Sequence, residues 1–396
     1  MTTQVSPVEA APTRDTVLGG RPALVAQSYL GFEQLPAKYD RLFEQAGLRS
    51  PFNTLAWYRN LARTTVESTE QVRIVGLELP DGTPVAALPL RHDRALRRGW
   101  KLRTLSSFSN YYTTLYEPLL DPAYPMRDTL RELARVIVTG SPAWDTINLK
   151  PMDRESPLFA ELELSFREAG MVVQTYFCHG NWYFPLHGKS YKEYLASLRS
   201  SVRNIANSKN KKLERSGRAR FEIISGQSGL DSAIAAYEKV YAASWKVQEP
   251  YPDFVPGLIR AYSELGWLRL GIAYIDNEPA AAQLWIVSNG TASIYKIAYD
   301  QKFKDLSIGS YLTTRMVEQT IETDHVQVLD YLSGDDRYKS DWMSDRREHW
   351  GILAMNPRTI GGAAAIVRHV GGRVVKRTVQ KFANKAPKPS QASPKT

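Results

Sequence analysis

The sequence has very little cysteine and no long apolar run. Cys178 is the single cysteine among 396 residues, so no disulfide can form within the chain. No apolar stretch approaches the roughly 20 residues that are needed to span a bilayer. The N-terminal segment lacks both a basic region and an apolar core, which argues against a signal peptide. These absences predict a cytoplasmic protein.

The signatures of several common enzyme classes are also missing. No Gly-x-Ser-x-Gly, Walker or Rossmann glycine pattern occurs, and the tyrosines and tryptophans form no RNP-type motif for nucleic acid. The six histidines show no metal-ligand spacing, so we expect no zinc site. Cys178 stands beside His179, and we interpret it as a strand residue rather than a nucleophile.

Acidic residues are absent from the end of the chain. Residues 351–396 contain nine lysines and arginines, which is nearly the whole formal net charge of +10. We predict a basic amphipathic helix over 363–383 and a disordered tail beyond it. One interpretation is a peripheral contact of 363–385 with the anionic inner face of the membrane. The alternative is that this segment packs against the core.

Length and composition predict more than one domain. A chain of 396 residues is too long for one ordinary domain and fits two. Residues 1–20 are rich in proline, threonine and alanine, and we expect them to be disordered. We place one module at 21–185, a second at 186–355, and a basic C-terminal region at 356–396.

Both halves of the chain repeat one order of predicted elements. Hairpin signals at Asp81-Gly82 and Asn289-Gly290 mark the turns between alternating strands. The predicted class is α/β (α+β), with two tandem modules, each a mixed, mainly antiparallel sheet flanked by helices. The first half has strands at 71–80, 83–91, 101–108 and 144–150 and a helix at 124–139; the second has strands at 267–276, 279–288, 291–300 and 326–332 and a helix at 308–322.

A basic helical segment is predicted between the modules, over 190–216. Eight lysines and arginines lie between 199 and 220 against one acid, Glu214. Arg199 and Arg203 are four residues apart, so they would share a helix face and could grip an anionic donor or acceptor. A solvated basic face is the alternative interpretation.

The turn before the predicted helix 308–322 is a candidate phosphate site. The first turn of a helix presents N–H groups that have no partner within the helix and that can hold a phosphate or pyrophosphate. An ordinary helix cap is the alternative. The predicted cofactor-binding residues are Lys296 on the preceding strand and Ser307, Ile308, Gly309 and Ser310 in the turn.

The end of strand 326–332 supplies the candidate catalytic residues. Asp330 lies among apolar neighbours, where burial would raise its pKa and make it a general base unless a lysine or arginine pairs with it. Asp335, Tyr338 and Lys339 follow in a polar loop. Tyr338 could return a proton to a leaving thiolate, and Lys339 could stabilise an oxyanion. A polar turn without function is the alternative.

This arrangement resembles the GNAT acyltransferase superfamily. Within it, 290–342 looks like the group often found beside cellulose and exopolysaccharide synthesis genes, which is related to the FemAB-type aminoacyl transferases. The GNAT motif Gln/Arg-x-x-Gly-x-Gly/Ala is replaced here by Leu306-Ser-Ile-Gly-Ser310, and Lys302 and Lys304 are expected to supply the missing charge. The resemblance rests on Tyr295, Lys296, Tyr299, Asp300, Ser307–Gly309, Asp330, Gly334, Asp335, Tyr338, Lys339 and Trp342, and on the segment 198–203.

The resemblance implies an acyltransferase of the EC 2.3 class. It would move an acyl group from a CoA thioester to an amine or hydroxyl of an amino sugar or surface-polysaccharide precursor. The acyl-CoA would be a co-substrate rather than a permanently bound cofactor, and no metal would be needed. One alternative is FemAB-like aminoacyl transfer from charged tRNA, which would contact the cluster at 199–220. Another is a non-catalytic module of a polysaccharide-synthesis complex. The predicted substrate-binding residues are Arg199, Arg203, Tyr295, Asp300 and Trp342.

Overall fold

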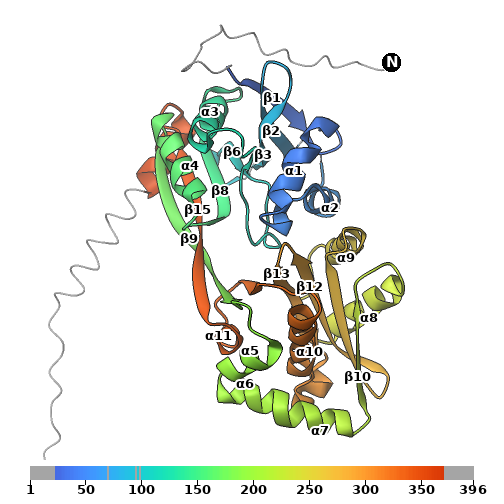
Figure 1. Cartoon of the computed structure of the whole chain (residues 1–396). Helices are drawn as coiled ribbons and strands as arrows, with labels where there is room; N and C mark the ends of the chain where they lie inside the picture. Colours follow the sequence, from blue (N-terminus) through green and yellow to red (C-terminus); the bar gives the residue numbers. More distant parts are fainter. Residues whose placement is uncertain (1–22, 69–70, 94–95, 98–99, 370–396) are drawn as a thin grey trace, which may run out of the picture.

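A computed structural model describes residues 23–68, 71–93, 96–97 and 100–369 of the chain (Figure 1). The disorder predicted for 1–20 lies outside these residues, and so does most of the helix predicted over 363–383. Residues 360–369 are helical. Within the described residues, no helix is both long enough and apolar enough to cross a membrane.

The first half of the chain is an α/β unit that begins and ends with a strand. Its main elements follow the order strand, two helices, three strands, helix, strand, helix, strand. They are β1 (Val25–Leu30), α1 (Asp40–Gly47), α2 (Leu55–Thr65), β2 (Val72–Glu78), β3 (Pro84–Asp93), β6 (Thr104–Ser107), α3 (Met126–Thr139), β8 (Thr146–Asp153), α4 (Pro157–Glu168) and β9 (Val172–Pro185).

The second half repeats that order element by element, which confirms the predicted pair of tandem modules. The short helices α5 (Tyr191–Ser197), α6 (Ser200–Asn204) and α7 (Asn210–Arg215) connect the two halves. The repeated elements are β10 (Ala219–Ile224), α8 (Leu230–Ala242), α9 (Phe254–Glu264), β11 (Leu268–Ile275), β12 (Glu278–Ser288), β13 (Thr291–Tyr299), α10 (Ile308–Glu322), β14 (Val328–Ser333), α11 (Lys339–Trp342) and β15 (Asp345–Met355).

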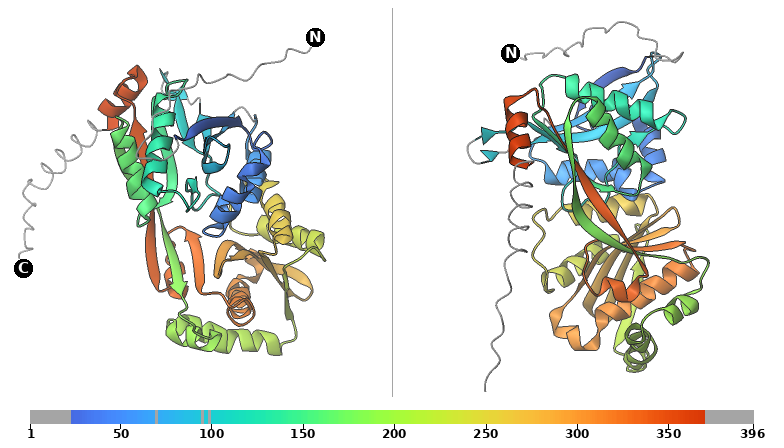
Figure 2. Two further views of the ribbon diagram at one scale, coloured as in Figure 1. Left: turned by 45° about the horizontal axis from the view of Figure 1, so that its top comes forward. Right: turned by 90° about the vertical axis from the view of Figure 1, so that its left-hand side faces the viewer.

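One continuous sheet runs through both halves, in the order β1-β2-β3-β6-β8-β15-β9-β14-β13-β12-β11-β10. The pairs β6–β8 and β13–β14 are parallel, and the other neighbours in this order are antiparallel. The last strand of each half pairs with the other half: β9 with β14, and β15 with β8. Figure 2 shows β9 and β15 side by side where the halves meet. Each half therefore completes the sheet of the other.

The largest apolar core belongs to both halves. Helices α1 and α2 of the first half and α8 and α9 of the second contribute to one buried cluster, while α3 with α4 and α10 with α5–α7 belong to two outer clusters. Alternation along β12 explains how one strand serves two cores, because Leu284 and Ile286 belong to the shared cluster and Trp285 to an outer one. The buried Asn60 amide also donates to the Phe254 carbonyl across the halves (3.0 Å).

Candidate active site between two diverging strands

Strands β13 and β14 run together for three residue pairs and then separate. They pair in parallel from Thr291 with Val328 to Ser293 with Asp330. A bulge next interrupts the pairing of β13 with β12 at Tyr295, and Leu332 of β14 has a positive φ of 54°. A cavity of about 200 Å³ lies at this opening. It is lined by Tyr111, Tyr112, Thr114, Lys246, Ile294, Tyr295, Lys296, Ile297, Tyr331, Leu332, Ser333, Asp336, Tyr338 and Lys339.

The first half supplies part of the cavity wall. Tyr111, Tyr112 and Thr114 lie in the loop between β6 and α3, whereas the rest of the lining belongs to the second half. The Tyr295 hydroxyl donates to the Tyr112 carbonyl (3.2 Å), which fixes that loop against β13. The candidate site is therefore formed by the tandem arrangement and not by the second module alone.

Glu249 holds the two halves together at the cavity. One carboxylate oxygen accepts a hydrogen bond from Lys296 (2.6 Å), and the other accepts from the hydroxyls of Tyr111 and Tyr112 (both 2.7 Å). Burial opposes the charge of Glu249, but these donors dominate and lower its pKa to about 2. Burial lowers the pKa of Lys296 in turn. Glu249 is thus a charged structural link and a poor proton acceptor at neutral pH.

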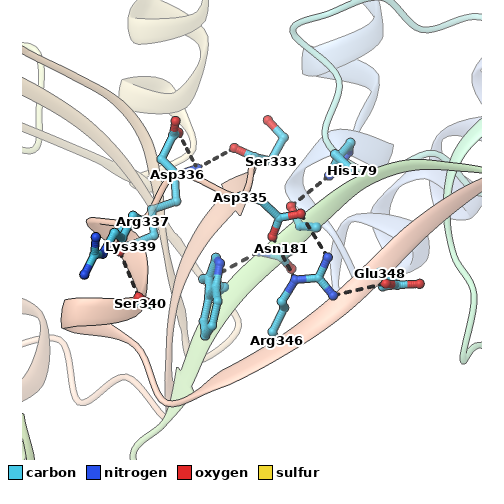
Figure 3. A network of polar contacts seen from close by, with 12 residues as sticks. His179, Asn181, Ser333, Asp335, Asp336, Arg337, Lys339, Ser340, Arg346 and Glu348 are labelled. Atoms are coloured by element: carbon cyan, nitrogen blue, oxygen red, sulfur yellow. Dashed lines mark hydrogen bonds and ion pairs between the residues drawn. The ribbon is translucent and has the colours of Figure 1, made fainter. Parts of the chain in front are cut away.

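Lys339 fixes the turn that follows β14 (Figure 3). Its side chain is buried, and its ammonium donates to the carbonyls of Tyr331 (3.1 Å) and Ser333. The nearest carboxylate is that of Asp336, at 4.0 Å. Burial lowers the pKa of Lys339. An ammonium has three donors, so one N–H remains for a ligand in the cavity.

Lys246 faces the same cavity from the loop after α8. Among the residues that the structure describes, its ammonium has no hydrogen bond and no ion pair. Burial, together with the nearby charge of Lys296, lowers the pKa of Lys246 to about 8. Sequence reasoning missed Lys246, Glu249, Tyr111 and Tyr112. The available signals were two adjacent tyrosines in one loop and charged residues near Trp245 in another.

Asp330 is buried and fully engaged by structural partners. Its carboxylate accepts from the amide of Asn181 (2.6 Å), from the backbone N–H of Leu332 (2.7 Å) and from the guanidinium of Arg347 (2.6 Å). The bond to Leu332 stabilises the positive φ that bends β14 away from β13. These contacts favour the interpretation of Asp330 as a paired structural carboxylate, and its role as a base stays a prediction.

Asp335 and Tyr338 lie in the loop after β14, in different surroundings. Asp335 forms a two-pronged ion pair with Arg346 (2.8 and 2.9 Å), which lowers the pKa of Asp335, and Arg346 also binds Glu348 (Figure 3). Tyr338 lines the cavity with 41% of its surface exposed, and burial raises the pKa of its hydroxyl. Tyr338 therefore remains protonated at neutral pH and can donate a proton.

The first turn of α10, where an anion site is predicted, begins at an uncapped residue. Ser307 adopts a left-handed conformation, and its side chain makes no capping hydrogen bond. The exposed Lys209, from the basic connector, reaches the Ser307 hydroxyl (3.4 Å). Lys302, expected to bring charge here, is bound instead to Glu278 (2.5 Å). Lys209, a residue far away in sequence, therefore adds a positive charge at this turn.

Four of the five predicted substrate-binding residues lie outside the cavity lining. Arg199 pairs with Asp341 (3.1 Å), and Arg203 donates to the carbonyls that end α5. The two arginines do not share a helix face, because Arg199 is the N-cap of α6 and precedes the helix. Asp300 caps a short helix over 301–306, and the carbonyl of buried Trp342 accepts from Tyr194. Only Tyr295 lines the cavity.

The corresponding opening in the first half is bridged by hydrogen bonds. Strands β6 and β8 also pair in parallel over three residues, from Thr104 to Ser106. Directly after that point, the hydroxyls of Ser107 and Ser109 both donate to the Lys150 carbonyl (2.7 Å). The Lys150 N–H donates back to Ser107 (3.1 Å). These bonds join the strands where β13 and β14 separate.

Comparison with known proteins now identifies the second half. Residues 200–340 match the model of the acetyltransferase (GNAT) domain. The chain carries a GNAT transferase domain. The matched range includes α10, the opening between β13 and β14, and the three cavity lysines. No curated protein matches the chain.

Solved structures show a similar fold over most of the chain. The crystal structure of FemX matches with a TM-score of 0.55 at 12% identity, over 83% of this chain and 96% of FemX. A protein of unknown function from Bacteroides thetaiotaomicron matches with a TM-score of 0.50 at 10% identity, over 76% and 90%. A tandem GNAT protein from the clavulanic acid pathway matches with a TM-score of 0.45 at 13% identity, over 85% and 100%. The match to FemX, at a TM-score above 0.5, shows that the chain has a FemAB-like fold.

The family and the fold define the general class of reaction. The protein is a transferase of the acyltransferase class. In the described part of the chain, no cluster of three or more histidine, cysteine, aspartate or glutamate side chains could hold a metal ion.

Proposed function

We propose that this protein is an N-acyltransferase that uses a CoA thioester as donor. The observation that carries this proposal is the opening between β13 and β14 next to the first turn of α10. The pyrophosphate of CoA would bind the N–H groups at Ile308–Ser310, beside Lys209. The acyl end would enter the cavity between the strands. An amino sugar or a surface-polysaccharide precursor, in the same cavity, would be the acceptor.

The reaction that suits this site is direct attack on the thioester. The acceptor nitrogen bonds to the carbonyl carbon and loses its proton to solvent at the mouth of the cavity. The carbon–sulfur bond then breaks, and the CoA thiolate leaves. The Lys339 ammonium would stabilise the oxyanion, and the Tyr338 hydroxyl would protonate the thiolate. Asp330 and Asp335 would act as positioning residues, through Leu332 and Arg346 respectively.

CoA binding tests the donor site. CoA should raise the melting temperature of the wild-type protein, because a ligand that binds the folded state stabilises it. Gly309→Asp should abolish the shift by placing a negative charge where the pyrophosphate binds. Gly309→Ala is the matched control, because it adds the same Cβ, 3.1 Å from the Tyr299 ring, without a charge. A CoA shift that is equal in both variants would exclude the α10 turn as the donor site.

A second candidate function is aminoacyl transfer from charged tRNA. It is favoured by the exposed Lys209, Lys211, Lys212 and Arg215, which form a basic surface on and beside α7, next to the first turn of α10. Phosphate contacts from such a surface would make binding strongly dependent on salt. Comparing the affinities of the wild type and the Lys211→Glu/Lys212→Glu variant for aminoacyl-tRNA separates the two candidates. Tight CoA binding without any tRNA binding would leave only the acyl-CoA function.

A further inference from the structure

Three lysine ammonium groups line one small cavity. Lys246, Lys296 and Lys339 come from three different elements and share a volume of about 200 Å³ with a single carboxylate, Asp336, in the lining. Ammonium groups that share one small cavity repel each other unless carboxylates neutralise them, and burial makes this repulsion stronger. The first question is therefore which of these charges already has a partner.

Only one of the three lysines has a close carboxylate partner. Lys296 pairs with Glu249 at 2.6 Å, so this pair is neutral overall. Lys339 is held by backbone carbonyls, and Asp336 is 4.0 Å from it with a side chain that is 65% exposed to solvent. Lys246 has no such partner among the described residues. Counting Glu249 and the more distant Asp336 against the three lysines leaves an excess of one positive charge, and Lys246 is the lysine without an ion pair among the described residues.

Two exposed aromatic side chains line the same cavity. Tyr111 and Tyr338 are 55% and 41% exposed. Large exposed aromatic surfaces around a polar cavity are typical of a ligand site, where a ring stacks on them. The cavity lining thus combines an unpaired cation with exposed aromatic rings.

We propose that the acceptor carries an acidic group, a carboxylate or a phosphate, and that Lys246 binds this group inside the cavity. The ring of the acceptor stacks on Tyr111 or Tyr338, which line the same cavity. The donor's pyrophosphate has a separate place, because none of the residues at Ser307–Ser310 lines the cavity. Calling the ligand the acceptor rests on the proposed function; the acid site itself does not.

The electrostatics of Lys246 support an anionic ligand. Its pKa, lowered to about 8, means that burial makes the charge costly and that a bound acid would stabilise it. Binding of an acid should therefore weaken as the pH rises through about 8 and Lys246 loses its proton. An arginine at this position stays charged and should remove that pH dependence.

The test compares acidic and neutral sugars as ligands of the full chain. Titration calorimetry would use D-glucosamine 6-phosphate against D-glucosamine, and D-glucuronate against D-glucose. We expect the wild type to prefer at least one acidic sugar by about tenfold or more, the size of one charge-assisted hydrogen bond. Lys246→Met should reduce this ratio to about one, whereas Lys246→Arg should keep it at pH 7 and at pH 9. Lys192→Met, at an exposed position of α5, is the matched control and should leave the ratio unchanged.

The two arms and the donor-site variant make the result decisive. A preference for the phosphate or for the carboxylate sugar identifies the acid, and either one supports the proposal. The preference for the acidic sugar should persist in Gly309→Asp. If Gly309→Asp removes this preference while Lys246→Met does not, the acid binds at α10 and the proposal is wrong. No preference in the wild type also overturns it. A preference that depends on Lys246 in a protein that does not bind CoA would retain the acid site and reject the proposed donor.

Discussion

Replacing Glu249 by glutamine tests the link between the two halves at the cavity. The pKa of this carboxyl falls from its ordinary value of 4.5 to about 2. Such a shift corresponds to about 3 kcal/mol of stability for the charged form at neutral pH. The Lys296 ammonium is buried in the folded protein, so Glu249→Gln would leave it there without its carboxylate partner. We expect the free energy of unfolding to fall by about 3 kcal/mol at pH 7.

The pH dependence gives this prediction its sign. A lowered folded-state pKa means that the stabilisation is complete above about pH 5 and disappears as the pH falls towards 2. The difference between wild type and Glu249→Gln should therefore shrink across that window. Urea unfolding at pH 7, 5 and 3 measures this difference in the free energy of unfolding. The double variant Glu249→Gln/Lys296→Met should recover part of the lost stability, because no buried charge remains at the pair. Equal unfolding free energies of wild type and variant at pH 7, or a difference that persists unchanged at pH 3, would refute the reasoning.

Three further predictions concern the catalytic loop, β14 and the C-terminal segment. Tyr338→Phe should lower kcat by about 10²-fold with unchanged unfolding in urea; full activity in steady-state assays would remove Tyr338 from the mechanism. Asp330→Asn should lower the free energy of unfolding by about 3 kcal/mol because Arg347 loses its buried partner. Asp335→Asn, which affects a more exposed pair, should lower it by less than about 1 kcal/mol. A larger loss for Asp335→Asn than for Asp330→Asn would contradict the assignment of Asp330 as structural. Deleting 370–396 should leave a folded enzyme that sediments less with anionic vesicles, since each basic residue near the surface contributes roughly 1 kcal/mol; equal sedimentation would exclude the membrane contact.

Local sequence patterns determined the regular elements of the repeat. The predicted helix 308–322 coincides with α10, because apolar residues at helical spacing face one outer core. The turn Asn289-Gly290 has φ angles of 48° and 73°, which these two residue types adopt at little cost. In such places the structural preference lies within a few neighbouring residues, so the sequence alone suffices.

The strands that join the halves could not be predicted in the same way. β15 begins with Asp345-Arg-Arg, which looks like a polar loop, yet Arg346 and Arg347 bind Asp335 and Asp330 once β15 lies between β8 and β9. Their partners Asp330 and Asp335 come from β14 and from the loop after it, which the local sequence around β15 does not reveal. The same holds for β9, which pairs with two strands that follow it by more than 140 residues.

The candidate site was predicted in part for the same physical reason. The sequence by itself indicated the α10 turn, Tyr295, Lys296, Tyr338 and Lys339, since all lie on or next to two strands of one repeated unit. Only the tertiary structure brought Tyr111, Lys246 and Glu249 to them, and only it paired Arg199 with the distant Asp341. Side-chain charges act over a few ångströms in space, whatever their separation along the chain, so their partners are decided by the packing of the two halves.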